Sequence, residues 1–147
     1  MNGTLHTVDP GNDTGLACFQ DGLLIEACTV AFEDFRYLEV LSGDRVLIEV
    51  PRHYQHNEKG DTNDLIDLAL RAGQVKEWCL MKNAKVELVH PRTWKGSVPK
   101  KIHNERVLRA LKDYERTLLP LKPRARTYDH NMIDAVGLGL WKLGRMT

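Results

Sequence analysis

Cysteine is scarce in this chain of 147 residues, which contains only Cys18, Cys28 and Cys79. Their odd number and wide spacing leave no CxxC pair, so zinc sites and dithiol redox centres built on such pairs are excluded. Apolar neighbours surround the three residues, a setting typical of buried, reduced thiols. We therefore assign the cysteines to packing.

Long hydrophobic runs are missing as well. Residues 135–141 form one of the longest, far short of the roughly 20 residues that cross a bilayer. Asp9 and Asp13 interrupt the region where a secretion signal would lie, so we expect a cytoplasmic protein. Internal repeats and low-complexity stretches are absent too, and the length and ordinary composition predict one globular domain over residues 1–147.

An excess of one charge sign is absent from the chain as a whole, whose net charge is +1, but not from its parts. Residues 92–126 hold eleven Lys and Arg against three acids, a local excess of eight positive charges. The rest of the chain therefore carries a net charge of −7. An acidic body with a basic flank suggests a polyanion held beside a carboxylate cluster, although a solvated helix face would look similar.

Strand and helix patterns alternate along the chain in an order that predicts an α/β fold. Three antiparallel strands come first, and parallel strands alternating with helices follow, giving a five-stranded mixed sheet flanked by helices. The turn Gln20-Asp21-Gly22 predicts a hairpin. The expected strands are 5–8, 14–19, 23–29, 45–50 and 85–89. The expected helices are a weakly patterned one over 32–41 and two clearer ones over 102–111 and 129–143. A further helix is expected to be capped by Asp61 or Asn63 and to run to Cys79.

Three acids occupy unusual places in these elements. Asp9 ends an apolar strand, Glu49 lies within an apolar strand, and Asp134 lies in the apolar stretch of the last helix. Each has an ordinary alternative, as a turn residue, a solvent-facing strand residue or a polar helix residue. Together they are harder to explain, because burying a carboxylate without a partner costs several kcal/mol. A divalent metal such as Mg²⁺ is a partner that takes oxygen ligands.

An ordered series of motifs surrounds these acids. The series resembles the RuvC family of Holliday-junction resolvases, which have an RNase H-like fold, over nearly the whole chain. Any one of the motifs is weak, and their order makes the set fairly specific. In chain order they are Asp9-Pro10-Gly11 with Thr14-Gly15, then Ile48-Glu49, then Ala69-Leu70-Arg71-Ala72-Gly73, then Val89-His90-Pro91 with Trp94-Lys95 and Lys100-Lys101, and finally Asp134-Ala135 preceded by His130 and Asn131.

The resemblance implies a Mg²⁺-dependent endonuclease that resolves four-way DNA junctions in recombination and repair. Two Mg²⁺ ions, which Mn²⁺ can replace, would hydrolyse a phosphodiester and leave a 5′-phosphate. Asp9 would bridge the ions, with Glu49 and Asp134 on either side. The resemblance also implies a homodimer, because a junction has near two-fold symmetry. The compact chain suits a phage-type member acting in a bacterial or phage-infected cell.

The sequence departs from the family in two places. The interval between Asp9 and Glu49 is shorter than in bacterial RuvC. The position three residues before Asp134, often an acid or His in the family, is Asn131 here, while His130 stands one residue earlier. His130 is therefore our first candidate for a fourth metal ligand or a proton shuttle, with Asn131 second. Asp129 is interpreted as the N-cap of the last helix.

DNA contacts are predicted in two segments. In the basic segment, Lys95 or Lys100 is the candidate for a catalytic contact with the scissile phosphate, and single lysines there also suit a plain exposed loop. Trp94 suits either stacking on an unpaired base or packing in the core. The polar loop after Glu49 suits either junction contact or an ordinary surface loop. The predicted DNA-binding residues are Arg92, Trp94, Lys95, Lys100, Lys101, His53 and Tyr54, whereas His6 and His103 carry no signal of a role.

Helix faces give two further expectations. The apolar face of residues 65–80, with Trp78 and Met81 at its end, suits a dimer interface or core packing. Gly137 and Gly139 each cost the last helix roughly 1 kcal/mol relative to Ala, which suggests that this helix packs closely against the sheet.

Three alternative functions are also compatible with the sequence. One is a broader nuclease of flaps, forks or RNA–DNA hybrids, and another is a non-catalytic RNase H-like module that binds DNA. The third, a phosphate-binding domain of the actin and sugar-kinase type, is disfavoured, because 147 residues cannot supply its two domains.

Overall fold

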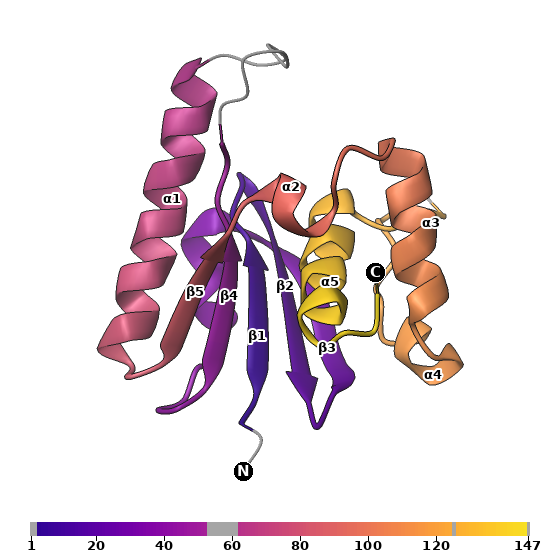
Figure 1. The fold of residues 1–147 in the computed structure, drawn as a ribbon, viewed down its shortest axis with the longest axis horizontal. Coiled ribbons are helices and arrows are strands. Elements are labelled where there is room, and N and C mark those ends of the chain that lie inside the picture. The colour runs from indigo at the N-terminus through magenta and orange to yellow at the C-terminus, as the bar shows by residue number, and fades with distance from the viewer. Residues whose placement is uncertain (1–2, 53–61, 125, 147) are drawn as a thin grey trace.

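A five-stranded mixed sheet forms the centre of the computed structural model, which describes residues 3–52, 62–124 and 126–146 (Figure 1). The strand order is β3-β2-β1-β4-β5. Strands β1, β2 and β3 pair antiparallel, whereas β4 pairs parallel with both β1 and β5. This arrangement confirms the predicted sheet. The strands are β1 (Leu5–Asp9), β2 (Asp13–Gln20), β3 (Leu23–Ala31), β4 (Arg45–Glu49) and β5 (Lys85–Val89).

The turn between β2 and β3 consists of Asp21 and Gly22. Both residues have positive φ angles, 52° and 80°. Two successive left-handed residues match the right-handed twist of the flanking strands, and Asp-Gly is a favoured pair for such a turn. The hairpin expected from Gln20-Asp21-Gly22 is therefore confirmed.

Helices cover the two faces of the sheet unequally (Figure 1). The 3₁₀ helix η1 (Phe32–Tyr37) and α1 (Thr62–Met81) lie on one face, and α5 (His130–Lys142) lies on the other, packed against β1, β2 and α3. The expected helix over residues 32–41 is thus only a short 3₁₀ segment. Asn63 lies inside α1, so it is not the cap, and Asp61 lies outside the described residues. The remaining helices are α2 (Pro91–Trp94), α3 (Lys100–Ala110) and α4 (Asp113–Arg116).

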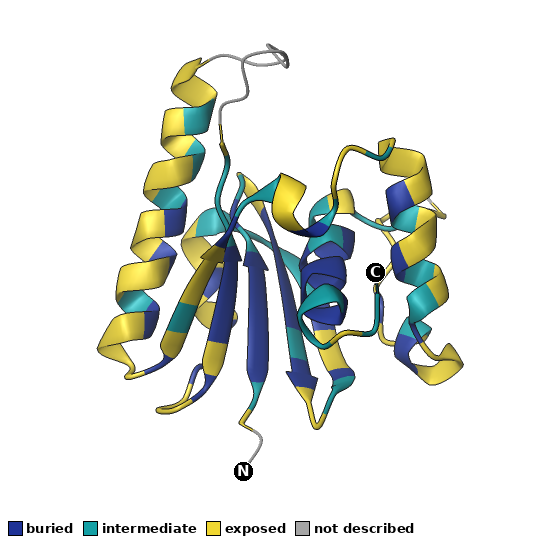
Figure 2. Ribbon diagram, viewed as in Figure 1, coloured by how far each residue is buried: buried dark blue, intermediate teal, exposed yellow. Residues whose placement is uncertain are grey.

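The two faces of the sheet bury separate clusters of apolar side chains. In β1, Leu5 joins the cluster beside α5, whereas Val8 joins the cluster beneath α1 and η1. In β4, Leu47 and Ile48 divide in the same way, because successive side chains of a strand point to opposite faces. Helix α5 is buried around most of its circumference, as the dark ribbon in Figure 2 shows.

Glycines let α5 approach its neighbours on two sides. A Cβ atom added at Gly139 would lie 2.1 Å from the Phe19 ring of β2, so the expected close packing on the sheet is confirmed there. A Cβ atom at Gly137 would instead lie 2.8 Å from Trp94 of α2 and 2.8 Å from Val107 of α3. Gly137 therefore serves the contact with α2 and α3, not the contact with the sheet.

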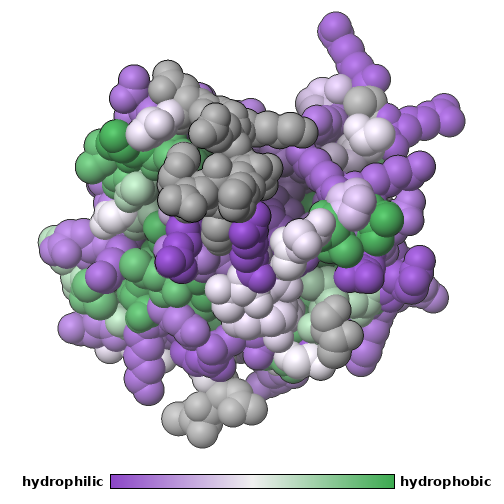
Figure 3. All heavy atoms as spheres, turned by 45° about the horizontal axis from the view of Figure 1, so that its top comes forward, coloured by the Kyte–Doolittle hydropathy of each residue, from purple (hydrophilic) through white to green (hydrophobic). Residues whose placement is uncertain are grey.

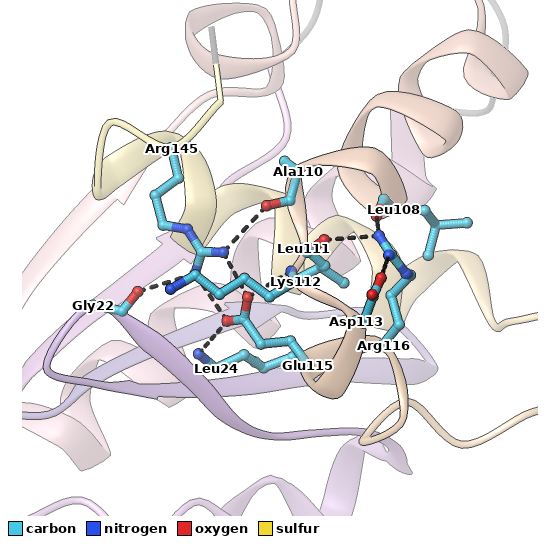
Figure 4. A network of polar contacts seen from close by, with 10 residues as sticks. All are labelled: Gly22, Leu24, Leu108, Ala110, Leu111, Lys112, Asp113, Glu115, Arg116 and Arg145. Atoms are coloured by element: carbon cyan, nitrogen blue, oxygen red, sulfur yellow. Dashed lines mark hydrogen bonds and ion pairs between the residues drawn. The ribbon is translucent and has the colours of Figure 1, made fainter.

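An ion pair that no sequence pattern predicts connects the chain's C-terminal segment to the hairpin of β2 and β3 (Figure 4). The Glu115 side chain is fully buried and accepts hydrogen bonds from Arg145 at 2.6 and 2.8 Å. It also accepts backbone N–H groups of Leu24 and Lys112, and Arg145 donates to the carbonyls of Gly22 and Ala110. Burial favours the neutral acid, but these hydrogen bonds lower the pKa of Glu115 to about 2.

The helices of the described segments are all too short or too polar to cross a membrane.

Candidate active site

Asp9 and Glu49 meet because β1 and β4 run parallel and end together. Val8 pairs with Ile48, and each acid is the next residue of its strand. Alternation along β1 places Asp9 on the same face as Thr7, and alternation along β4 places Glu49 on the face of Leu47. Both carboxylates therefore lie on the side of the sheet that α5 covers.

Helix α5 brings the third acid to the same place. The Thr7 hydroxyl donates a hydrogen bond to the Ala135 carbonyl at 2.5 Å, which fixes the helix over β1. Asp129 caps the helix by accepting the Asn131 N–H at 2.8 Å, as predicted from the sequence. One carboxylate oxygen from each of Asp9, Glu49 and Asp134 lies within 4.8 Å of the others. The structure thus brings together the three acids that the sequence singled out.

Gly15 sets how closely α5 approaches the sheet at this point. It pairs with Asp9 across β1 and β2. A Cβ atom added at Gly15 would lie 1.9 Å from the Asn131 carbonyl oxygen and 2.3 Å from its carbon. These are backbone atoms of the first turn of α5, so they cannot move aside as a flexible side chain would.

Replacing Gly15 with Ala is therefore expected to push the start of α5 away from β2 and to lower the free energy of unfolding by roughly 1–3 kcal/mol. Urea denaturation measures this loss. The matched control is Gly73→Ala in α1, where the added methyl group meets nothing within 4 Å and alanine favours the helix. Equal stability of the two variants would contradict the close contact at Gly15.

The three carboxylates differ in their electrostatic surroundings. Burial, and then the charges of Glu49 and Asp134, raise the pKa of Asp9 well above its usual value. Burial also raises the pKa of Glu49, although Lys95 and Trp94 oppose the shift. Burial acts on Asp134 in the same direction, but contacts from His103 and Lys95 outweigh it and lower its pKa. A bound cation would therefore stabilise the charged form of Asp9 more than the charged forms of the other two acids.

The last residue of α2, Trp94, and its C-cap, Lys95, supply donors to the flanking carboxylates. The Trp94 indole Nε1–H donates to Glu49 Oε2 at 2.8 Å. The Lys95 ammonium lies 3.2 Å from Asp134 Oδ2 and 3.7 Å from Glu49 Oε1, so it bridges the two acids. Trp94 is only 5% exposed, which favours core packing over base stacking, the two alternatives that the sequence left open; its ring packs in the core and its indole N–H holds Glu49.

His103 is the residue of this site that the sequence analysis missed. Its Nε2 lies 3.5 Å from Asp134 Oδ1, and its ring packs edge-on against Trp94 with centroids 4.9 Å apart. The only available signal was its position four residues before Val107, on the buried face of α3. One histidine on a buried helix face is more often a packing residue than a functional one, so that signal was weak.

The other predicted residues lie around this cluster. His130 is exposed at the first position of α5, and its role as a fourth ligand stays a prediction. Asn131 is half-buried in the same turn. Arg92, Lys100 and Lys101 are exposed on α2 and α3, so their DNA contacts stay predictions. His53 and Tyr54 lie outside the described residues.

The donor set fits a divalent metal ion. All three groups offer carboxylate oxygen, the ligand type of Mg²⁺ and Mn²⁺, and no thiol belongs to the cluster. The side chains of Glu49 and Asp134 are only 11% and 13% exposed. A bound cation would offset the negative charge that these two acids and Asp9 bring together. The site can therefore bind a divalent metal.

Comparisons with known proteins identify the fold. No protein-family model and no curated protein matches the sequence. A solved structure of Thermus thermophilus RuvC in complex with a Holliday junction substrate matches with a TM-score of 0.53 and 17% identity, covering 94% of this chain and 91% of that one. A second T. thermophilus RuvC structure matches with a TM-score of 0.52 and 16% identity, covering 98% of both chains. The chain therefore has the RuvC-like form of the RNase H-like fold.

Proposed function

We propose that this protein is a metal-dependent endonuclease that resolves four-way DNA junctions. The observation that carries the proposal is the meeting of Asp9, Glu49 and Asp134 at one end of the sheet, in a chain that has the fold of RuvC. A RuvC of this fold has been solved with a Holliday junction substrate. The carboxylate cluster is a chemical reason to propose the same kind of DNA substrate, a four-way junction, for this chain.

Each residue of the site has its own role in the proposed reaction. Asp9, Glu49 and Asp134 would hold two Mg²⁺ or Mn²⁺ ions. When bound, such ions lower the pKa of the attacking water and stabilise the charge on the departing 3′ oxygen. Trp94 keeps Glu49 in place through its indole N–H. Lys95, whose side chain is 24% exposed beside both flanking acids, is the group best placed to contact the scissile phosphate.

The basic segment would bind DNA beside this site. Helices α2 and α3 stand on the same side of the sheet as α5 (Figure 1), and they carry the exposed Arg92, Lys100 and Lys101. These exposed cations would bind backbone phosphates, contacts that position DNA without reading its sequence. We assign them to strand positioning next to the cleavage site.

A homodimer would match the two-fold symmetry of the junction. The face of α1 first considered for this contact is used in the core, because Ala72, Val75 and Cys79 are buried there. The opposite face exposes Ile66 and Leu70, which are 51% and 61% exposed. Hydrophobic residues gather over α1 on the left in Figure 3. The outward face of α1 is therefore the proposed dimer interface.

The test compares a four-way junction, a fork and a linear duplex of matched sequence, each 5′-labelled, at one salt concentration because salt changes all of these affinities. We expect the junction to be cut at least about tenfold faster than the fork in Mg²⁺, with symmetric nicks and 5′-phosphate ends. Equal cutting of fork and junction would favour a broader branched-DNA nuclease. Junction binding without any cutting in Mg²⁺ or Mn²⁺ would favour a non-catalytic module.

A further inference from the structure

His103 presents a buried nitrogen with incomplete hydrogen bonding. The residue is 4% exposed, and its Nε2 makes no hydrogen bond of ordinary geometry within the described chain. The polar atom it faces is Asp134 Oδ1, at 3.5 Å. Leaving a buried donor unpaired costs about 1–3 kcal/mol, so such a group in a folded protein needs an explanation.

Packing holds the imidazole in this place from two directions. Trp94 contacts the ring edge-on, and that same Trp94 donates its indole N–H to Glu49. Val107, one turn along α3, packs against Gly137, one turn after Asp134 on α5. The position of His103 relative to Asp134 is therefore fixed by the docking of α3 on α5.

The contacts on the two flanking carboxylates follow one pattern. Glu49 has Trp94 at one oxygen and Lys95 at the other. Asp134 has Lys95 at one oxygen and His103 at the other. Each flanking acid thus has a neighbouring donor for both of its oxygens. Asp9 makes no side-chain hydrogen bond with any residue in the described ranges.

We propose that His103 is a positioning residue for Asp134, its Nε2–H directed at Oδ1 so that the carboxylate keeps one orientation toward the bound metal ion. This role rests on the proposed metal site. The imidazole belongs to α3, not to the start of α5 where His130 lies, and it is not itself a metal ligand. His103 acts on the metal only through Asp134.

The experiment measures Mn²⁺ binding by titration calorimetry on the full chain without DNA. His103→Leu removes the nitrogen, and His103→Gln keeps an N–H close to the position of Nε2. We expect the Leu variant to bind Mn²⁺ about 10–100-fold more weakly and the Gln variant to stay within about threefold of the wild type. His103→Asn, whose amide is too short to reach, is expected to behave like Leu and serves if the Leu variant fails to fold.

His6 offers a matched control. It is also a buried histidine beside an aspartate, with Nε2 2.9 Å from Asp44 Oδ2, but it lies on the opposite face of the sheet. His6→Leu should lower the melting temperature and leave the Mn²⁺ affinity unchanged. Wild-type Mn²⁺ affinity in both His103→Leu and His103→Asn would overturn this inference but not the proposed metal site. Mn²⁺ binding by the Gln variant as weak as that of the Leu variant would have the same consequence. A wild-type protein that does not bind Mn²⁺ would overturn the inference together with the proposed metal site.

Discussion

Asp9→Asn is expected to slow junction cleavage by at least about a thousandfold, while junction binding remains within a few-fold of the wild type. The variant removes the carboxylate that interacts with both other acids, so metal-assisted stabilisation worth several kcal/mol is lost. The basic residues proposed to hold phosphates are untouched. Single-turnover cleavage in Mg²⁺ and in Mn²⁺, beside a gel-shift measurement in EDTA, separates the two effects.

The same variant is expected to raise the melting temperature of the metal-free protein at pH 7. The pKa of Asp9 is higher in the folded chain than in the unfolded one, mainly through burial and then through Glu49 and Asp134. The folded state therefore binds the proton more tightly, and the charged Asp9 costs stability that is regained as the pH falls. Asn removes this cost. Undiminished cleavage by a folded Asp9→Asn protein would rule out the assigned site.

Arg145→Met is expected to lower the free energy of unfolding by about 3–5 kcal/mol, the largest stability effect of any substitution considered. It leaves the Glu115 carboxylate, which is 0% exposed, without its cationic partner, whose side chain is 19% exposed. The hydrogen bonds from Arg145 to Gly22 and Ala110 are lost as well. Urea denaturation at pH 7 measures the change.

The matched control for Arg145 is Lys142→Met, which removes a cation from the half-exposed pair with Glu87. Exposed ion pairs contribute about 0–1 kcal/mol, so this control should be nearly neutral. Similar losses of unfolding free energy in the two variants would mean that burial does not make the Arg145–Glu115 pair more stabilising than an exposed ion pair.

The pH dependence of the Arg145 effect follows from Glu115. Its pKa is about 2 in the folded chain, below the ordinary value of 4.5, so the stabilisation is complete above pH 4.5. It is lost as the pH falls from there toward 2, and amounts to about 3 kcal/mol. The difference in stability between wild type and Arg145→Met should therefore shrink over this pH range.

The sheet and the three acids could be predicted from sequence because they depend on short-range patterns. The period of two in β1 and β4 decides which face Asp9 and Glu49 occupy, and the helix at the end of the chain is marked by its Asp129 cap. Parallel pairing of strands that end in acids then brings these carboxylates together. The cap and the strand alternation are local properties, readable from a few adjacent residues.

The contacts that Trp94 and His103 make with the carboxylates could not be predicted, because they depend on how helices dock. Trp94 and His103 meet the carboxylates only because Gly137 lets α2 and α3 approach α5. The pairing of Glu115 with Arg145 joins residues from two segments that carry no common motif. His130 was favoured as a ligand because it precedes Asp134 in sequence, whereas the imidazole beside Asp134 comes from α3.

The hydrogen bond from Thr7 to Ala135 joins residues 128 positions apart, and the carboxylate cluster spans nearly the same stretch of chain. A protein emerging from the ribosome therefore has β1 and β4 long before it has the helix that carries Asp134. Contacts of such long range also form late and slowly in folding. The cluster of three acids therefore cannot assemble on a nascent chain until the residues of α5 have been synthesised and have docked against β1.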